Sequence, residues 1–118
     1  MTNTTNTPAT ALPAVWRRNQ QGDLYRDDVP PSPIHATLWL TTRGAQADVT
    51  LELKGGTYPH RDTLRQHGFT YNPNETAPRE SSWTLRLAGE GGPIVKRLTD
   101  LSVELGVTHI AVIRSLNA

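Results

Sequence analysis

The sequence predicts a single small α+β domain, in which a mostly antiparallel sheet of about five strands carries two helices on one face. Three observations predict this class. Several short segments alternate apolar and polar residues, which is typical of strands with one buried face. Two other segments begin with helix-starting residues and end at a glycine. A chain of 118 residues has room for one such domain, with the element order ββαββαβ.

The beginning of the chain is expected to lie outside this domain. Residues 1–12 are rich in Thr, Asn and Ala without any charge, and they predict a disordered tail. Residues 13–33 keep neither a strand period nor a helix period, so they predict an irregular lead-in with a short strand or hairpin near residues 15–25. The folded domain is therefore expected to span residues 34–118.

Two alternating segments predict the first hairpin. In residues 36–42, leucines alternate with threonines and Trp39, and in residues 48–54 three apolar residues alternate with polar ones that end at Lys54. Gly44 lies in the turn between the two segments. Trp39 and Lys54 are expected on the face opposite the apolar residues.

A short helix is predicted after this hairpin. Gly55 and Gly56 end the strand, Thr57 is expected to cap the helix with its side chain, and Pro59 is tolerated in a first turn. Gly68 can take the left-handed conformation that ends a helix. Two to three turns are unstable in isolation, so the helix needs to pack on the sheet. The side chains expected to provide this packing are Tyr58, Leu64 and Phe69.

The remaining elements complete the sheet. Residues 69–71 and 83–87 predict two strands joined by a loop rich in turn-forming residues. A second helix is expected to open at Pro93 and to close at Gly106, since apolar residues recur between them at helical spacing. Residues 107–116 are rich in Ile and Val, which favours a central strand.

Composition excludes several classes of function. The net charge is +1, so the chain lacks the overall basicity that gives many nucleic-acid-binding proteins their long-range attraction. The chain has no cysteine, which excludes disulfides, thiolate metal sites and cysteine nucleophiles. No segment approaches the ~20 apolar residues of a membrane helix, and the start does not resemble a secretory signal. A cytoplasmic protein without a membrane partner is expected.

Basic residues provide two candidate binding surfaces. On the uncovered sheet face, Trp39 could stack on a base while Lys54 and Arg86 hold phosphates. On the short helix, Arg61 and Arg65 lie one turn apart, next to backbone N–H groups of the glycine-rich turn. These five side chains are expected to converge at the sheet edge beside the glycine pair. An ordinary solvated or dimerising face is the alternative for each surface.

The histidines do not predict a metal site or an active site. His60 and His67 are seven residues apart, a poor spacing for ligating one metal ion from a helix. No motif joins a nucleophile to a general base, so no cofactor and no enzymatic activity are expected. A pocket that gathered His60, His67 and a carboxylate would favour an enzyme instead.

The segment from Lys54 to Trp83 resembles a small uncharacterised module of phage, plasmid and bacterial DNA-metabolism proteins, over about a quarter of the chain. The module follows the pattern KG-x-TYP-x-(R/K)-(D/E)-x-L-x-x-x-G-(F/G)-x-(W/Y)-(N/D), then a loop and W. The loop before the tryptophan is longer and more acidic here. The resemblance implies a nucleic-acid context. The matching residues are Lys54, Gly55, Thr57, Tyr58, Pro59, Arg61, Asp62, Leu64, Gly68, Phe69, Tyr71, Asn72 and Trp83.

Together these features favour a non-catalytic nucleic-acid-binding protein of bacterial or phage DNA metabolism, with single-stranded DNA as the preferred ligand. The alternative is a protein-interaction or homo-oligomerisation module that uses the open sheet face or an edge strand. The near-neutral charge favours this alternative.

Overall fold

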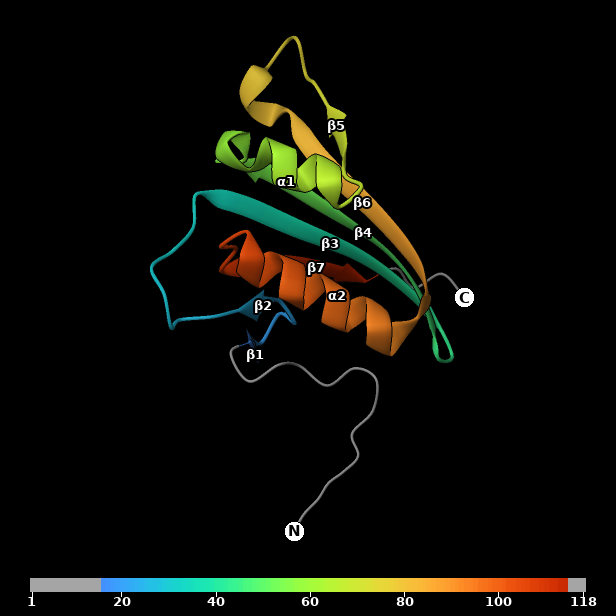
Figure 1. The fold of residues 1–118 in the computed structure, drawn as a ribbon. Coiled ribbons are helices and arrows are strands. Elements are labelled where there is room, and N and C mark those ends of the chain that lie inside the picture. The colour runs from blue at the N-terminus through green and yellow to red at the C-terminus, as the bar shows by residue number, and fades with distance from the viewer. Residues whose placement is uncertain (1–15, 115–118) are drawn as a thin grey trace.

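The computed structural model describes residues 16–114, which form a seven-stranded mixed sheet with two helices on one of its faces (Figure 1). All neighbouring strands are antiparallel except β3 and β7, which are parallel. The α+β class and the single covered face are as predicted, but the sheet has seven strands rather than about five, and two strands precede the predicted order ββαββαβ. The tail expected at residues 1–12 lies outside the described residues. In sheet order the strands are β1 (Arg17–Arg18), β2 (Leu24–Tyr25), β7 (His109–Arg114), β3 (Ile34–Arg43), β4 (Gln46–Gly55), β6 (Ser82–Glu90) and β5 (Thr70–Asn72).

The centre of the sheet follows from strict alternation in the sequence. Strands β3 and β4 pair over their whole length, from Ile34 opposite Gly55 to Arg43 opposite Gln46. The apolar residues of β4 all point to the helix-covered face, where they are buried. Strand β7 lies between β2 and β3, so the Ile- and Val-rich segment is internal to the sheet, as predicted.

Both helices bury one apolar stripe against the same sheet face. The 3₁₀ helix η1 (Tyr58–His60) leads into α1 (Arg61–Gln66), whose Leu64 is completely buried. Helix α2 (Gly91–Glu104) begins two residues before Pro93, a small shift at a helix boundary. The core between the layers is one continuous cluster. Its contributions from α1, α2 and the residue that follows α2 are Leu64, Ile94, Leu98, Leu101 and Leu105.

Both predicted glycine stops are confirmed. Gly68 has a φ of +91°, and the next residue, Phe69, donates its backbone N–H to the carbonyl of Leu64 at 3.0 Å. After α2, the N–H of Val107 is bonded in the same way to the carbonyl of Ser102 at 2.8 Å. This pattern satisfies carbonyls that the helix end would otherwise leave without a donor.

The predicted side-chain cap of the first helix is wrong. The hydroxyl of Thr57 makes no capping hydrogen bond and lies 3.5 Å from the carbonyl of Gly55. The backbone N–H of Thr57 donates to that same carbonyl at 2.7 Å, and the N–H of Gly56 donates to the carbonyl of Pro33 at 3.1 Å. Because both N–H groups already have acceptors, they are not available to bind an anion together with Arg61 and Arg65.

The lead-in segment belongs to the folded unit, in contrast to the expected start at residue 34. Strands β1 and β2 form the predicted hairpin and extend the sheet beside β7. Trp16 is 4% exposed, and Leu24 is also part of the core. The segment is tied to the start of β7 by the N–H of Ser32, which donates to the hydroxyl of Thr108 at 3.0 Å. Two-residue strands carry no detectable alternation, so the sequence pattern did not show that this hairpin joins the sheet.

Candidate nucleic-acid interface

A pocket of about 340 Å³ lies between η1 and α1, the β5–β6 pair and the loop that joins them. Its lining combines three arginines with three aromatic side chains, and no described lining residue is Asp or Glu. We call it the arginine pocket. The six residues that define it are Arg61, Arg65, Arg79, Tyr58, Tyr71 and Trp83.

One wall of the arginine pocket is an aromatic pair across β5 and β6. Tyr71 lies opposite Trp83 in the antiparallel register, and the ring centroids are 4.8 Å apart with the planes at 45°. Trp83 is 4% exposed and belongs to the core, whereas Tyr71 is 47% exposed. Trp83 therefore fixes the wall, and Tyr71 presents an accessible ring to the pocket.

Helix α1 holds two guanidinium groups against aromatic rings. The Cζ atom of Arg61 lies 4.1 Å from the centroid of the Tyr58 ring, and that of Arg65 lies 5.4 Å from the Trp83 ring. A guanidinium that stacks on a ring keeps its N–H groups at its edge, where they can bind a planar or tetrahedral anion. Arg61 Nη1 donates to the carbonyl of Tyr58 at 2.9 Å, and Arg65 Nη1 lies 3.4 Å from the Asp62 carboxylate. Most of the donors of both arginines therefore remain available.

The third arginine comes from the loop between β5 and β6. Arg79 lies in the 3₁₀ helix η2 (Pro78–Glu80), and the described residues offer its side chain no hydrogen bond or ion pair. The loop is closed by two bonds of Asn74, whose N–H donates to the Ser81 hydroxyl and whose Oδ1 accepts from the N–H of Ala77, both at 2.9 Å. These bonds hold the backbone on both sides of Arg79.

Lys54 forms an ion pair with this loop. Its Nζ lies 3.3 Å from Glu80 Oε1, and neither residue lines the pocket. Exposed pairs of this kind contribute about 0–1 kcal/mol to stability. Lys54 therefore orients the Arg79 loop and partly offsets the charge of Glu80.

The uncovered sheet face carries Trp39, as predicted, with 41% of its surface exposed. Trp39 and Arg86 both lie opposite Thr50, on either side of β4, so the three form one row across the face. Arg86, however, makes two hydrogen bonds to Asp48, at 3.1 Å and 2.6 Å. These bonds lower the pKa of the Asp48 carboxyl and raise the pKa of Arg86. The Arg86 guanidinium is therefore already paired with the Asp48 carboxylate and is less available to bind a phosphate.

The five residues predicted to converge lie in separate places. Arg61 and Arg65 share the arginine pocket. Lys54 does not line this pocket, because it alternates with the buried Leu53 and so points to the uncovered face, where it is paired with Glu80. Trp39 and Arg86 lie on the opposite face of the sheet, because strand residues at these positions point away from the helices. The structure thus separates the predicted residues into a pocket and an open face.

Sequence reasoning missed three residues of the pocket as binding candidates. Tyr58 was expected to pack on the sheet but is 72% exposed, with its ring under Arg61. The position of Tyr71 beside Trp83 follows from the β5–β6 register, which alternation alone does not give. Arg79 lies in a loop without a period, so no pattern could have assigned it a direction.

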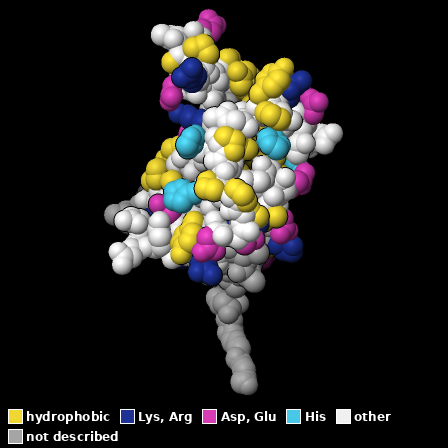
Figure 2. All heavy atoms as spheres, turned by 90° about the vertical axis from the view of Figure 1, so that its left-hand side faces the viewer, with side chains coloured by type: hydrophobic (Ala, Val, Ile, Leu, Met, Phe, Trp, Pro, Cys, Tyr) yellow, Lys and Arg dark blue, Asp and Glu magenta, His cyan; other side chains and the backbone are white. Residues whose placement is uncertain are grey.

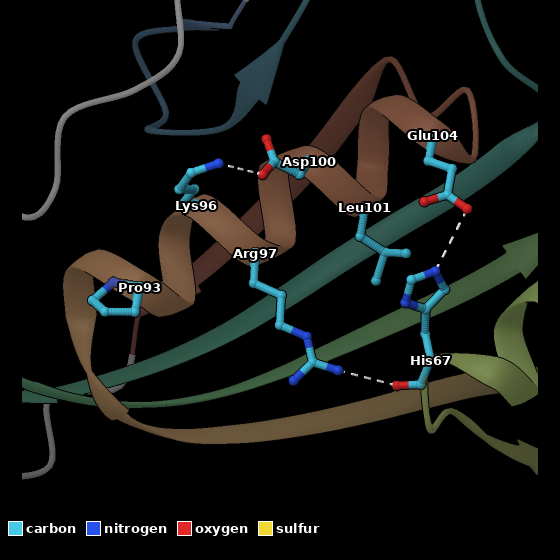
Figure 3. A pocket seen from close by; sticks show the side chains of 7 residues that line it. All are labelled: His67, Pro93, Lys96, Arg97, Asp100, Leu101 and Glu104. Carbon is cyan, nitrogen blue, oxygen red and sulfur yellow. Dashed lines mark hydrogen bonds and ion pairs between the residues drawn. The ribbon is translucent and has the colours of Figure 1, made fainter.

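A second pocket, of about 380 Å³, lies along α2 (Figure 3). Its polar side chains contact one another: Lys96 Nζ lies 2.7 Å from the Asp100 carboxylate, and His67 Nε2 lies 3.5 Å from the Glu104 carboxylate. Arg97 reaches across to donate to the carbonyl of His67 at 3.2 Å. Two carboxylates in the lining make this pocket a poor site for a polyanion.

The histidines do not share a pocket. His67 lines the pocket along α2, whereas His60 lines a shallow depression beside the Pro30–Pro33 segment. Within residues 16–114, no group of three or more His, Asp or Glu side chains could hold a metal ion. None of the helices in this range has the length and apolar character needed to cross a membrane.

Figure 2 shows the side of the molecule that lies on the left in Figure 1, and this side carries both basic and acidic side chains. Basic and acidic side chains alternate there around hydrophobic and histidine side chains, and no extended basic surface forms on that face (Figure 2). Any anion bound on this side has to be recognised by a local cluster. The arginine pocket is such a cluster.

No protein-family model, no curated protein and no solved structure matches the chain. The likeness of the segment from Lys54 to Trp83 to the DNA-metabolism module therefore depends on the residues of this segment alone.

Proposed function

We propose that this chain is a non-catalytic nucleic-acid-binding protein with a preference for single-stranded DNA, and that the arginine pocket is its binding site. The observation that carries the proposal is the presence of three arginines and three aromatic rings in one pocket without a lining carboxylate. Arginine forks bind phosphate oxygens in pairs, and aromatic rings stack on bases. The two residue types serve the two chemical parts of a nucleotide.

The exposed tyrosines favour a single strand over a duplex. A base can stack on Tyr58 or Tyr71 only when it is not stacked within a double helix, and such stacking contributes about 1–3 kcal/mol per base. A pocket of about 340 Å³ is at the small end of ligand sites. It has room for a nucleotide but not for a duplex.

The cellular setting that we propose, bacterial or phage DNA metabolism in the cytoplasm, is supported by the resemblance of the segment from Lys54 to Trp83. The pocket residues Tyr58, Arg61, Tyr71 and Trp83 are all part of the matching pattern. The pattern thus contains most of the pocket.

Fluorescence anisotropy with a labelled single-stranded oligonucleotide tests the proposal. If about three phosphate contacts form, the affinity should fall with a logarithmic salt slope of about −2, which is about 20-fold between 50 and 200 mM salt. A duplex of the same sequence should bind more weakly. The proposal fails if no salt-sensitive binding to single strands is measured.

Self-association through the uncovered sheet face is the second candidate function. Trp39 and Ile113 are neighbours across β3 and β7, and Ile113 is 47% exposed, so the face presents an apolar pair without a helix over it. On this reading, light scattering should show a dimer that Trp39→Ala converts to a monomer. A wild-type monomer at micromolar concentration, or a dimer that Trp39→Ala leaves intact, would exclude this use of the face.

A further inference from the structure

We infer that the arginine pocket recognises a terminal phosphate at the end of a DNA strand, rather than an internal phosphodiester. This inference rests on the proposed function and specifies the ligand of the same site. It follows from the charge of the pocket, its hydrogen-bond donors and its boundaries.

The local charge matches a phosphomonoester. Arg61, Arg65 and Arg79 contribute three positive charges to the lining, and Asp62, whose carboxylate lies 3.4 Å from Arg65, contributes one negative charge. Two positive charges therefore remain. A terminal phosphate carries about −1.5 to −2 at neutral pH, whereas an internal phosphodiester carries a single charge. A diester would leave the cluster with an unneutralised positive charge.

The three arginines of the pocket also have more free N–H donors than a phosphodiester has oxygens to accept them. Each arginine has five N–H donors, and Arg61 and Arg65 each use one of them, toward the Tyr58 carbonyl and the Asp62 carboxylate. A terminal phosphate offers three strong acceptor oxygens, compared with two unesterified oxygens in a diester. Three guanidinium groups from two separate segments can surround three oxygens, with each fork bound in a bidentate manner.

The boundaries of the pocket favour a strand end. It is bounded by η1 and α1, by β5 and β6, and by the loop that carries η2, with Gly55 at the end of β4 completing the lining. This loop and α1 lie over the same end of the sheet (Figure 1). A strand end needs one entrance to such a pocket, whereas an internal nucleotide needs a path for the chain on both sides. Tyr58 and Tyr71 are placed to stack on the terminal base.

Three oligothymidylates of equal length test this inference by competition against a labelled strand: one with a 5′-phosphate, one with a 3′-phosphate and one without a terminal phosphate. One of the phosphorylated strands should bind about tenfold more tightly than the unphosphorylated one, since a charge-assisted hydrogen bond is lost without the phosphate. Arg79→Ala should remove this preference, and Arg86→Ala, on the other face, should retain it. Comparison of the two phosphorylated strands identifies which end is recognised.

A second readout uses the indole N–H signals of the tryptophans in NMR spectra. Thymidine monophosphate should shift the Trp83 signal, because Trp83 lies under Arg65, and should leave Trp39 unchanged. Unphosphorylated thymidine should shift neither.

The possible failures are distinct. Equal affinities of all three strands, with salt-sensitive binding retained, would overturn the terminal-phosphate inference and leave the proposed function standing. Stronger competition by a phosphotyrosine peptide than by thymidine monophosphate would overturn it in favour of a protein ligand. No binding of any oligonucleotide would remove the proposed function and the inference together.

Discussion

Replacement of Gly55 by alanine is expected to destabilise the fold by about 3 kcal/mol, with two physical causes. Gly55 has a φ of +89°, in the left-handed region, where a residue with a Cβ loses about 1–2 kcal/mol. In addition, a Cβ on Gly55 would lie 2.4 Å from the carbonyl oxygen of Pro33. That oxygen belongs to the backbone, so the clash requires the chain to move, which costs about a further 1–3 kcal/mol.

Gly22→Ala is the matched control for this prediction. Gly22 has the same φ of +89°, but a Cβ there would meet no atom within 4 Å. It should therefore lose only the conformational part, about 1–2 kcal/mol. Urea unfolding of both variants measures the difference. Equal losses would show that the close approach of Gly55 to Pro33 does not contribute to stability.

The contact between Gly55 and Pro33 helps to explain why the lead-in, residues 16–33, belongs to the domain. The carbonyl of Pro33 accepts a hydrogen bond from Gly56 and lies against Gly55, at the point where β4 turns toward η1. The end of the lead-in therefore helps to fix where α1 begins. The position of Arg61 and Arg65 depends in turn on this start.

The parts of the fold that could be predicted from the sequence are those with local signals. Alternation over ten residues defines β3 and β4, and a glycine with a local hydrogen-bond pattern ends each helix. A hairpin near β1 and β2 was predicted, but its place in the sheet was not, because strands of two residues show no alternation. The insertion of β7 between β2 and β3 depends on contacts distant in sequence, among them the acceptance by Asp23 of the N–H of Val112 at 2.9 Å.

The candidate site was predicted only in part, for a similar reason. The presence of Arg61 and Arg65 one turn apart is a local feature, and it placed both on one helix face. Alternation correctly placed Trp39 on the uncovered face, but the expected convergence with Arg61 and Arg65 at the sheet edge was wrong, because α1 holds both arginines over the covered face. Arg86 on β6 pairs with Asp48 on β4, although the residue directly opposite Arg86 is Thr50. The sequence could not predict this diagonal contact, and so it could not show that Arg86 is not free to bind phosphate.

Removal of all three pocket arginines is expected to have the largest effect on function. Arg61→Ala, Arg65→Ala and Arg79→Ala together should weaken binding to single-stranded DNA by about 1,000-fold. Each hydrogen-bonded contact with a phosphate contributes about 1.5–3 kcal/mol, so the loss of three contacts at the lower end of this range weakens binding by about three orders of magnitude. The salt dependence of any residual binding should be close to zero, since the charged contacts are gone.

A second triple variant controls for the loss of charge. Arg18, Arg43 and Arg86 are exposed and lie outside the arginine pocket, so their replacement by alanine lowers the net charge by the same amount. Its affinity should remain within about threefold of the wild type, because distant surface charges are screened at moderate salt. Circular dichroism and urea unfolding establish that both triple variants are folded.

The comparison of these two triple variants in one anisotropy titration tests the location of the binding site most directly. A site in the arginine pocket predicts a loss of about 1,000-fold in the pocket variant and little change in the control variant. Equal losses in both would show that only overall charge matters, and a larger loss in the control variant would place binding outside the pocket.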